Sequence, residues 1–371
     1  MTPVLPAVGR LERGVPLAPF TTFGLGGPVA LWCGDVTTDE LPGVARAILD
    51  ETGSPPLLLG DGSNLLVADG PISRGVIRLG GHGFTLGPSW GEVVDVAVDA
   101  GTSWDGFVSD AVNAGLQGVE CLSGIPGRVG AAPIQNIGAY GQEVSDTVVA
   151  VEGLDLLTGA VIALTAADCA FGYRTSRFKT GDSTFAVTRV HFRLRTQSSP
   201  TVAYRDVAEA LLAVADPTLQ VVRECVLAIR RRKSMVIDAT DPNRRSAGSF
   251  FTNPVVTSGH ADALAAENGG ELPRYQSTGG VKLSAAWLIE NAGVARGFEL
   301  GGARVSTRHT LALTAASASC RTSDIVRLAA HVRRAVRRRF GVTLEPEPVF
   351  VGFDRSATQV LDEAEESLPN D

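Results

Sequence analysis

Apolar residues recur along this chain with two different spacings, and the change between them falls near residue 200. Before that point, apolar and polar residues often alternate, as they do in half-buried β-strands. Beyond it, apolar residues recur every three or four positions, as they do on the buried face of an α-helix. The pattern predicts a strand-rich N-terminal part followed by an α+β C-terminal part.

The N-terminal part is predicted to combine strands with short helices. Ser103 is a suitable N-cap for a helix that runs to Asn113 and ends at Gly115. Thr158 and Gly159 are suited to the turn of a β-hairpin. The predicted strands are 56–60, 93–98, 147–154, 161–164 and 184–195, and a further helix is predicted at 41–50.

A polar stretch with a proline, 197–200, marks the predicted domain boundary. After it, helices are predicted at 206–213, 219–232, 259–268, 283–291 and 323–340, with short strands at 249–251 and 310–314. From Ser356 onward the chain is acidic and lacks a clear apolar face. We therefore expect a disordered tail over 356–371.

Composition narrows the class of protein. The chain has 371 residues, of which 44% are hydrophobic, enough for two or three globular domains. It contains no apolar run long enough to span a bilayer, and residues 1–4 do not begin a signal peptide, so we expect a cytoplasmic protein. A net charge of −7 argues against broad nucleic-acid binding.

Cysteine and histidine usage argues against a disulfide framework and a metal site. The five cysteines are scattered and contain no CxxC pair, so buried free thiols are expected. The five histidines lack the spacing of metal ligands. Arginines gather in 333–339, late in a predicted helix, where a solvated helix end is favoured over a nucleic-acid patch.

Two glycine-rich segments, 60–64 and 123–141, carry the clearest chemical signal. The first follows an apolar run and is predicted to be a strand-to-loop turn, and the second is predicted to be a long loop. Glycines allow close approach of the backbone to a flat or anionic group, and free backbone N–H groups can bind phosphates. Two such loops indicate one large cofactor.

Polar side chains gather in four further segments, each of which also has a purely structural interpretation. In segment 172–179, an arginine could bind a carboxylate, or the charged residues could simply be exposed on a hairpin. In segment 246–254, a serine lies beside two aromatic residues and could donate a proton. The structural alternative is that this segment is simply a turn. Segment 344–348 holds two carboxylates between prolines, and 282–293 is mainly a packing helix that begins with Lys282.

Taken together and in this order, these motifs resemble those of the UDP-N-acetylenolpyruvoylglucosamine reductase family, over roughly residues 17–352. The sequences that carry the resemblance are GDGSN at 60–64, GIPG at 124–127, QNIGAYG at 135–141, YR at 173–174, GSFF at 248–251, KLS at 282–284 and LEPE at 344–347. The form PIQN at 133–136 and the segment around Tyr204 resemble the type I branch.

The resemblance implies an α+β fold: a vanillyl-alcohol-oxidase/PCMH-type FAD-binding region over 17–196, in two subdomains divided near residue 75, and a separate α+β substrate-binding domain over 205–352. It implies non-covalently bound FAD, with NADPH as reductant and UDP-N-acetylglucosamine enolpyruvate as substrate. The implied product is UDP-N-acetylmuramate, a precursor of peptidoglycan. We further expect a monomer without nucleic-acid partners or membrane insertion.

The resemblance also assigns roles to residues. Arg174 would bind and polarise the substrate carboxylate, Glu347 would assist it, and Ser249 would protonate the carbanion. The implied FAD-binding residues are Gly60, Gly62, Ser63, Asn64, Gly124, Ile125, Pro126, Gly127, Gly130, Gln135, Asn136, Gly138, Ala139 and Tyr140. The implied substrate-binding residues are Tyr173, Tyr204, Lys233, Asn253 and Lys282.

Three alternatives stay open on the sequence. Another flavin oxidoreductase of the same fold would keep both glycine loops but would not need Ser249, Arg174 and Glu347 together. A non-catalytic sugar-nucleotide sensor would bind the nucleotide without a flavin. A nucleic-acid binder would act through 333–339 and would lose affinity steeply with added salt.

Overall fold

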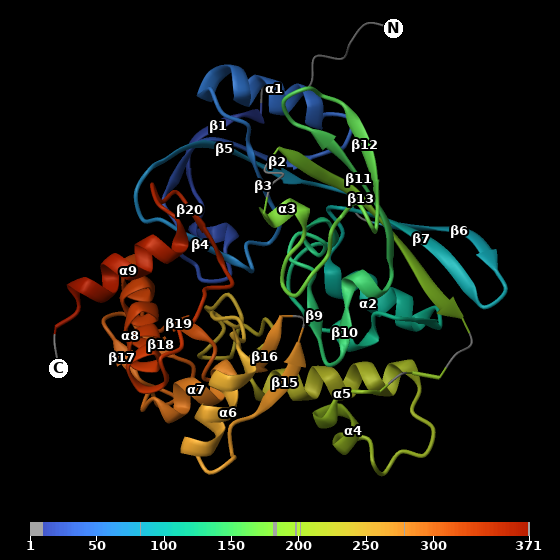
Figure 1. Ribbon diagram of the computed structural model, residues 1–371. Coiled ribbons are helices and arrows are strands. Elements are labelled where there is room, and N and C mark those ends of the chain that lie inside the picture. Colours follow the sequence, from blue (N-terminus) through green and yellow to red (C-terminus); the bar gives the residue numbers. More distant parts are fainter. Residues whose placement is uncertain are drawn as a thin grey trace, which may run out of the picture. The chain divides into compact units, whose positions relative to one another are not determined.

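The computed structural model describes residues 10–81, 83–180, 184–196, 199–200, 202–277 and 279–369 (Figure 1). The chain divides into two compact units. The first contains the start of the chain, Pro28–Asp61 and Ile72–Ile237, and the second contains Pro16–Gly27, Gly62–Pro71 and the chain from Asp238 onward. Residues 1–4, residues 197 and 198 of the predicted boundary and the last two residues of the predicted tail lie outside the described residues.

The first unit begins with a four-stranded sheet in the order β1-β2-β5-β3. Its strands are β1 (Glu12–Pro16), β2 (Pro28–Val36), β3 (Leu57–Leu59) and β5 (Ile72–Leu79), and β5 runs parallel to β2 and β3. The predicted helix is confirmed as α1 (Leu41–Thr52), which buries Val44 and Ile48. A Cβ on Gly75 of β5 would lie 2.3 Å from Cγ2 of Ile48, so only glycine allows this helix to pack so closely.

A second, largely antiparallel sheet follows in the order β12-β11-β13-β7-β6. Its strands are β6 (Phe84–Trp90), β7 (Val93–Asp99), β11 (Val148–Asp155), β12 (Val161–Thr165) and β13 (Phe185–Thr196), with β8 (Leu116–Gln117) beside β13. The predicted strands and hairpin are thus confirmed. The helix α2 (Trp104–Asn113) is capped by Ser103 as predicted, and its Phe107 packs on Phe192 at 4.9 Å between ring centroids.

Two helices that the sequence placed beyond the domain boundary belong to the first unit. They are α4 (Arg205–Ala210) and α5 (Leu219–Arg232), and the bounds of α5 match the prediction. Val207, Val222 and Val226 form a buried cluster with Cys121 in the short 3₁₀ helix Glu120–Leu122. This apolar packing makes 205–237 part of the first unit, which differs from the predicted division at 197–204.

The second unit contains small sheets and helices around its own core. β4 (Leu65–Val67) pairs in parallel with β20 (Val349–Val351), near the other end of the sequence. The remaining strands are β14 (Val255–Val256), β15 (Arg274–Ser277), β16 (Gly280–Leu283), β17 (Glu299–Leu300), β18 (Ala303–Val305) and β19 (Leu313–Ala315). The helices are α6 (Ser258–Glu267), α7 (Ala285–Asn291) and α8 (Thr322–Phe340), close to the predicted ranges.

Two local predictions in the second unit need correction. Leu283 is the last residue of β16 and not the first residue of a helix. The Ser284 hydroxyl accepts the Trp287 N–H as N-cap, so α7 begins at Ala285. The strand predicted at 249–251 is reduced to a single bridge between Phe251 and Pro346.

The predicted disordered tail is wrong for most of its length, since Ala357–Ser367 form helix α9. Ser356 and Gln359 form a capping box at its start. Leu361 is fully buried in the core of the second unit, and Val360 and Ala364 pack against that core. The acidic composition suggested a solvated segment, but acidic side chains of α9, such as Asp362 and Glu365, form ion pairs with Arg333 of α8.

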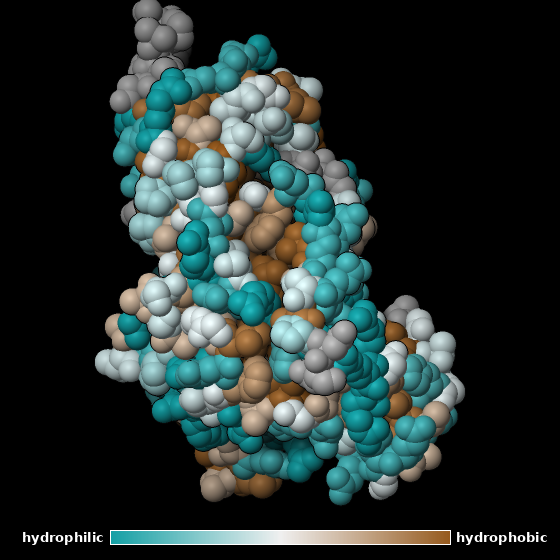
Figure 2. Space-filling view, turned by 90° about the vertical axis from the view of Figure 1, so that its left-hand side faces the viewer, coloured by the Kyte–Doolittle hydropathy of each residue, from teal (hydrophilic) through white to brown (hydrophobic). Residues whose placement is uncertain are grey.

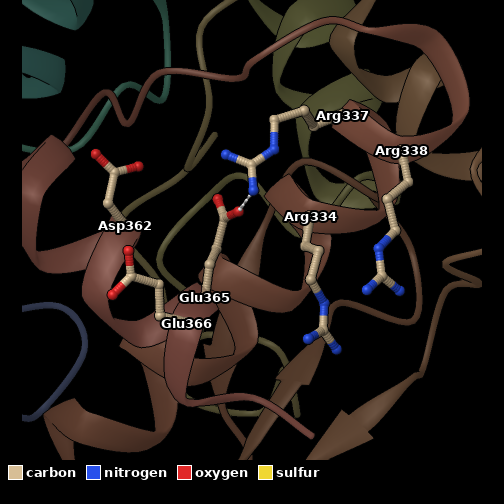
Figure 3. A pocket seen from close by; sticks show the side chains of 6 residues that line it. All are labelled: Arg334, Arg337, Arg338, Asp362, Glu365 and Glu366. Atoms are coloured by element: carbon tan, nitrogen blue, oxygen red, sulfur yellow. Dashed lines mark ion pairs between the residues drawn. The ribbon is translucent and has the colours of Figure 1, made fainter. Parts of the chain in front are cut away.

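The prediction of a solvated end of α8 is also wrong for two of its arginines, Arg333 and Arg334, which are both buried. Arg333 is 2% exposed and its Nη1 lies 2.6 Å from Asp362 and 3.2 Å from Glu365. Figure 3 shows Arg337 of α8 paired with Glu365 of α9. Burial raises the pKa of the Glu365 carboxyl, and the neighbouring arginines oppose this rise. Buried charges of opposite sign therefore join the two helices.

The helices in the described part of the chain include no candidate for a membrane-spanning segment. None of its helices combines the length and the apolar character that crossing a bilayer requires. The face drawn in Figure 2 carries hydrophilic residues over much of its area. The cysteines match the prediction of free thiols, since Cys33, Cys121, Cys169 and Cys320 are buried and Cys225 is half-buried.

Replacing Arg333 by alanine should destabilise the protein by about 3 kcal/mol, because removing one member of a buried ion pair leaves its partner charge poorly compensated. Chemical denaturation followed by circular dichroism measures this change. The matched control is Arg355→Ala, which removes an exposed pair with Glu363 and should cost less than about 1 kcal/mol. Equal effects of the two substitutions would contradict the assigned role of Arg333.

Candidate active site

The start of the first glycine-rich segment, Gly60 and Asp61, contacts the second segment inside the first unit. A Cβ on Gly60 would lie 3.6 Å from the Cβ of Ala131 and 3.9 Å from that of Arg128. The Asp61 carboxylate accepts a hydrogen bond of 2.8 Å from Arg128 Nε. The end of β3 therefore lies against the loop that follows α2, as expected if both segments bind one cofactor.

The sequence analysis did not select the charged residues that make this contact. Arg128 Nη1 also donates to the carbonyl oxygens of Leu79 and Gly101, at 3.0 and 2.8 Å. Arg78 Nη2 donates to the same Asp61 oxygen at 2.9 Å. A charged residue inside a glycine-rich turn was the only signal in the sequence, and its partners become visible only in the fold.

Several residues of the long loop hold its backbone in an unusual conformation. Asn136 and Tyr140 adopt positive φ angles of 48° and 50°, in the left-handed region. The buried Asn136 amide donates to Glu143 and to the Gly172 carbonyl, and its oxygen accepts the Ser145 N–H. Asn136 therefore stabilises the loop through its side chain.

Asp105, at the start of α2, fixes the first turn of the loop. Its Oδ1 accepts the Gly124 N–H and Arg223 Nη1, both at 2.6 Å, and its Oδ2 accepts Arg223 Nη2 at 2.9 Å. Burial raises the pKa of the Asp105 carboxyl, but these hydrogen bonds outweigh it and the pKa falls below its ordinary value. A Cβ on Gly124 would lie 2.7 Å from Leu227 of α5, so the loop also packs tightly on that helix.

The loops have the character that a flavin nucleotide requires. Their predicted contact residues are half-buried, neither hidden in the core nor fully exposed; they are Gly60, Ser63, Asn64, Ile125, Pro126, Gly127, Gly130, Gln135, Gly138, Ala139 and Tyr140. Gly62 and Gly124 are buried and have positive φ angles. Flexible backbone beside small apolar side chains can contact both a flat ring and a diphosphate. The residues thus fit FAD.

Arg174 lies in segment 172–179, outside the long loop, and also has a positive φ, of 53°. Its Nη2 donates to the Gly138 carbonyl at 2.5 Å, and its Nη1 donates to the Asn136 carbonyl at 3.4 Å. The guanidinium carbon lies 5.4 Å from the ring centroid of Tyr173. The predicted carboxylate-binding arginine is therefore held by the same loop that carries the predicted flavin contacts.

Tyr204 and Lys233 come together with Tyr140 in the first unit. The two tyrosine rings meet edge to face at 5.4 Å between centroids. Lys233 Nζ lies 2.9 Å from Asp206 Oδ2 and 6.0 Å from the Tyr140 ring. Burial raises the pKa of the Tyr140 hydroxyl. Three residues predicted to bind ligands thus form one cluster, at the N-terminus of α4 and the C-terminus of α5.

Arg230 is a further polar residue at this cluster that the sequence analysis missed. Burial lowers the pKa of its guanidinium, which donates to the Met235 carbonyl at 2.7 Å. Its Nε–H is buried and donates to no protein group among the residues that the structure describes. The sequence of the basic segment 230–233 did not indicate which of its four cationic side chains is buried.

Ser249 and Glu347 lie on neighbouring segments of the second unit. The Glu347 N–H donates to the Phe250 carbonyl at 2.8 Å, and the Thr252 N–H donates to the Glu345 carbonyl at 3.0 Å. Asn64 Nδ2 donates to the Glu347 carbonyl at 3.3 Å. The predicted proton donor and the predicted carboxylate are therefore on paired segments, whereas Arg174 belongs to the first unit.

Asn253 precedes the three-stranded sheet β14-β16-β15 of the second unit, and Lys282 lies on its central strand. Asn253 Oδ1 accepts the Ala285 N–H at 2.9 Å and so caps α7. Lys282 stands between Val255 and Tyr275 on neighbouring strands. Tyr275 is 56% exposed and was not selected from the sequence, because nothing before the fold indicated that it pairs with Lys282.

Comparison with known proteins settles the family. Residues 241–351 match the family described as UDP-N-acetylenolpyruvoylglucosamine reductase, C-terminal domain, and residues 37–165 match an FAD binding domain. A UDP-N-acetylenolpyruvoylglucosamine reductase of Thermobifida fusca is 47% identical over 350 residues, which cover 92% of this chain and 98% of that protein. The chain belongs to the UDP-N-acetylenolpyruvoylglucosamine reductase family. It is thus an FAD-dependent oxidoreductase.

Other members of the reductase family agree in extent and fold. A relative from Mycobacterium tuberculosis is 43% identical, over 93% of this chain and 96% of that protein. The crystal structure of the reductase from Thermus caldophilus is similar with a TM-score of 0.61 and 29% identity, and covers 92% of this chain and 99% of that one. The predicted fold class, an FAD-binding region of PCMH type with a separate α+β domain, is confirmed.

The Asp105 contacts predict how stability depends on pH. Because the folded pKa lies below the ordinary value of 3.8, the ionised carboxylate stabilises the fold fully above that pH, and the contribution is lost as the pH falls through the folded pKa. Asp105→Asn should therefore lower the free energy of unfolding by about 1–3 kcal/mol at neutral pH. Urea denaturation should show this difference shrinking below pH 3.8. A difference independent of pH would contradict the assignment.

Proposed function

We propose that this chain reduces the enolpyruvyl group of UDP-N-acetylglucosamine enolpyruvate to the lactyl group of UDP-N-acetylmuramate, with NADPH as reductant, in peptidoglycan synthesis. The observation that carries the proposal is the pairing of the Ser249 segment with the Glu347 segment, in a chain whose glycine loops fit FAD. A proton donor and a carboxylate on paired segments suit protonation of a carbon next to a carboxylate.

FAD is proposed to bind without a covalent link, through the residues of the two glycine loops named above. When bound, it would take hydride from NADPH and deliver it from N5 to the terminal vinyl carbon of the substrate. Burial raises the pKa of the neighbouring Cys121 thiol to about 12. A thiol with so little thiolate is a poor nucleophile, which supports non-covalent binding.

Arg174, Glu347 and Ser249 are proposed to act on the substrate. Negative charge develops on the carbon that bears the carboxylate and spreads into the carboxylate oxygens. The Arg174 guanidinium binds these oxygens and stabilises the charge, with Glu347 assisting. The Ser249 hydroxyl then donates its proton to the carbon. Ser249 is followed by the buried Phe250 and Phe251, whose packing holds it in place.

The residues proposed to bind the nucleotide part of the substrate are Tyr173, Tyr204, Lys233, Asn253 and Lys282. Lys233 and Tyr204 offer a cation and a hydroxyl for a diphosphate, and Tyr173 and Lys282 offer the same groups elsewhere. The Asn253 side-chain oxygen caps α7, so its NH₂ group is the part proposed for the ligand. We propose a cytoplasmic monomer. The pairing of Arg333 with α9 speaks against nucleic-acid binding through 333–339.

Anaerobic visible spectroscopy tests this function directly. Flavin absorbance of the purified protein should bleach with NADPH and return on addition of UDP-N-acetylglucosamine enolpyruvate. Bleaching without return would favour a flavin oxidoreductase with another substrate. A protein that binds the sugar nucleotide in calorimetry but stays colourless with added FAD would favour a sensor and overturn the proposal.

Ser249→Ala should leave reduction of the flavin by NADPH nearly unchanged but slow the substrate half-reaction by about 10²–10⁴-fold, because a general acid contributes a factor of that size. Stopped-flow absorbance measures the two halves separately. Ser367→Ala, which removes an exposed hydroxyl of α9 in the same unit, is the control and should affect neither half. Equal slowing of both halves in the Ser249 variant would rule out its role as proton donor.

A further inference from the structure

Three charged side chains gather at the start of the first glycine loop. Asp61 Oδ1 accepts hydrogen bonds from Arg128 Nε at 2.8 Å and from Arg78 Nη2 at 2.9 Å. The side chains of Asp61, Arg78 and Arg128 are 32%, 27% and 18% exposed, so solvent screens these contacts less than it screens surface pairs. We call these residues the Asp61 cluster.

Arg128 connects the Asp61 cluster to the rest of the first unit. Its Nη1 binds the carbonyls of Leu79, at the end of β5, and Gly101, after β7. Backbone bonds on both sides fix it further, from Trp104 N–H to the Gly127 carbonyl and from Val129 N–H to the Thr102 carbonyl, each 2.9 Å. The long loop is therefore attached to two sheets at Arg128.

The contact with Asp61 then links the first loop to this fixed point. Gly60 and Asp61 follow β3 directly, and the Asp61 side chain reaches Arg128, which lies in the second loop. A shift of either loop would break a charge-assisted hydrogen bond, the stronger class of such bonds. Arg128 thus holds Gly60 and Asp61, at the start of the first loop, against the second loop.

The cluster also leaves positive charge beside the glycine loops. Two guanidinium groups share one carboxylate oxygen. Arg78 Nε is buried and has no protein partner within the described part of the chain. An excess of positive charge at a glycine-rich turn favours an anionic ligand such as the diphosphate of FAD.

We propose that Asp61 is a positioning residue for FAD: through Arg128 and Arg78 it holds the start of the first glycine loop against the second loop within the first unit, and thereby determines the affinity for the cofactor. Asp61 would act on the loops and not on the reacting atoms. The inference rests on FAD binding, which the family establishes, and not on the identity of the substrate.

Asp61→Asn tests the proposal, because it keeps the size of the side chain and removes its charge. FAD affinity of the apoprotein, measured by quenching of flavin fluorescence, should fall about tenfold or more, as expected for weakened charge-assisted hydrogen bonds. Saturating FAD should restore substrate reduction to near the parental rate. Since FAD binding is measured without substrate, its result is independent of the proposed reductase activity.

A second ion pair of the same unit provides the control. Asp95 accepts two hydrogen bonds from Arg193, at 2.8 and 3.0 Å, within the sheet and outside the glycine loops. Asp95→Asn should leave FAD affinity unchanged, while thermal unfolding of both apoproteins reports any general loss of stability. Unchanged affinity in the Asp61 variant, or an equal loss in the Asp95 variant, would overturn the proposal.

Arg128→Lys decides the question if Asp61→Asn does not fold. Lysine keeps the charge, but a single ammonium group cannot replace the planar guanidinium that reaches Asp61, Leu79 and Gly101 together. FAD affinity should again fall about tenfold. A folded Arg128→Lys protein that binds FAD as tightly as the parent would refute the positioning role.

Discussion

The Asp105 carboxylate is the contact on which the arrangement of the first unit depends. It binds the backbone of the long glycine loop at Gly124 and the guanidinium of Arg223 on α5. Arg223 is only 8% exposed, so without Asp105 it would be a buried cation lacking its main partner. The helix pair that carries Tyr204 and Lys233 is therefore tied to the loop that fits the flavin. This explains why α4 and α5 belong to the first unit.

In the second unit, the register of the pairing between β4 and β20 determines where the candidate catalytic segments lie. β4 pairs with β20, and the Val349 N–H donates to the Asn64 carbonyl at 2.9 Å. The Thr322 hydroxyl donates to the Val67 carbonyl at 2.6 Å and so attaches α8 to the same strand. A shift of β20 by one residue would turn its side chains to the opposite face and displace Glu347 from the Ser249 segment. A short segment from early in the sequence thus positions chemistry near the end.

Local sequence signals predicted the elements well where the deciding contacts are local. The bounds of α5 follow from the Thr218 cap and a regular apolar face, and Ser103 marks the start of α2. The predictions failed where partners are distant in sequence. The predicted disorder over 356–371 is wrong for Ala357–Ser367, because acidic side chains of α9 pair with arginines distant in sequence, such as Asp362 with Arg333. The division into two compact units also differs from the predicted domain ranges, because segments distant in sequence pack together.

The candidate site was predicted through motifs, while the contacts that shape it were not. The glycine loops and the polar segments identify the residue types, but Asp61, Arg128 and Asp105 gain their importance from partners on other elements. Spacing along one chain carries no information about which carbonyl a guanidinium will reach. For this reason Arg128 looked like an ordinary loop residue, although it bonds to three separate segments.

Arg174 illustrates how the site couples two tasks. Its guanidinium already donates to the carbonyls of Asn136 and Gly138, so its orientation is set by the loop that fits the flavin. A substrate carboxylate bound by this arginine would be placed relative to that loop, without a separate positioning element. Proximity of reacting groups lowers the entropic part of a barrier only when both partners are held. The proposed sharing of one loop between cofactor and carboxylate would meet that condition, so the loop's attachment at Asp105 and Arg128 would then serve the proposed catalysis as well as the fold.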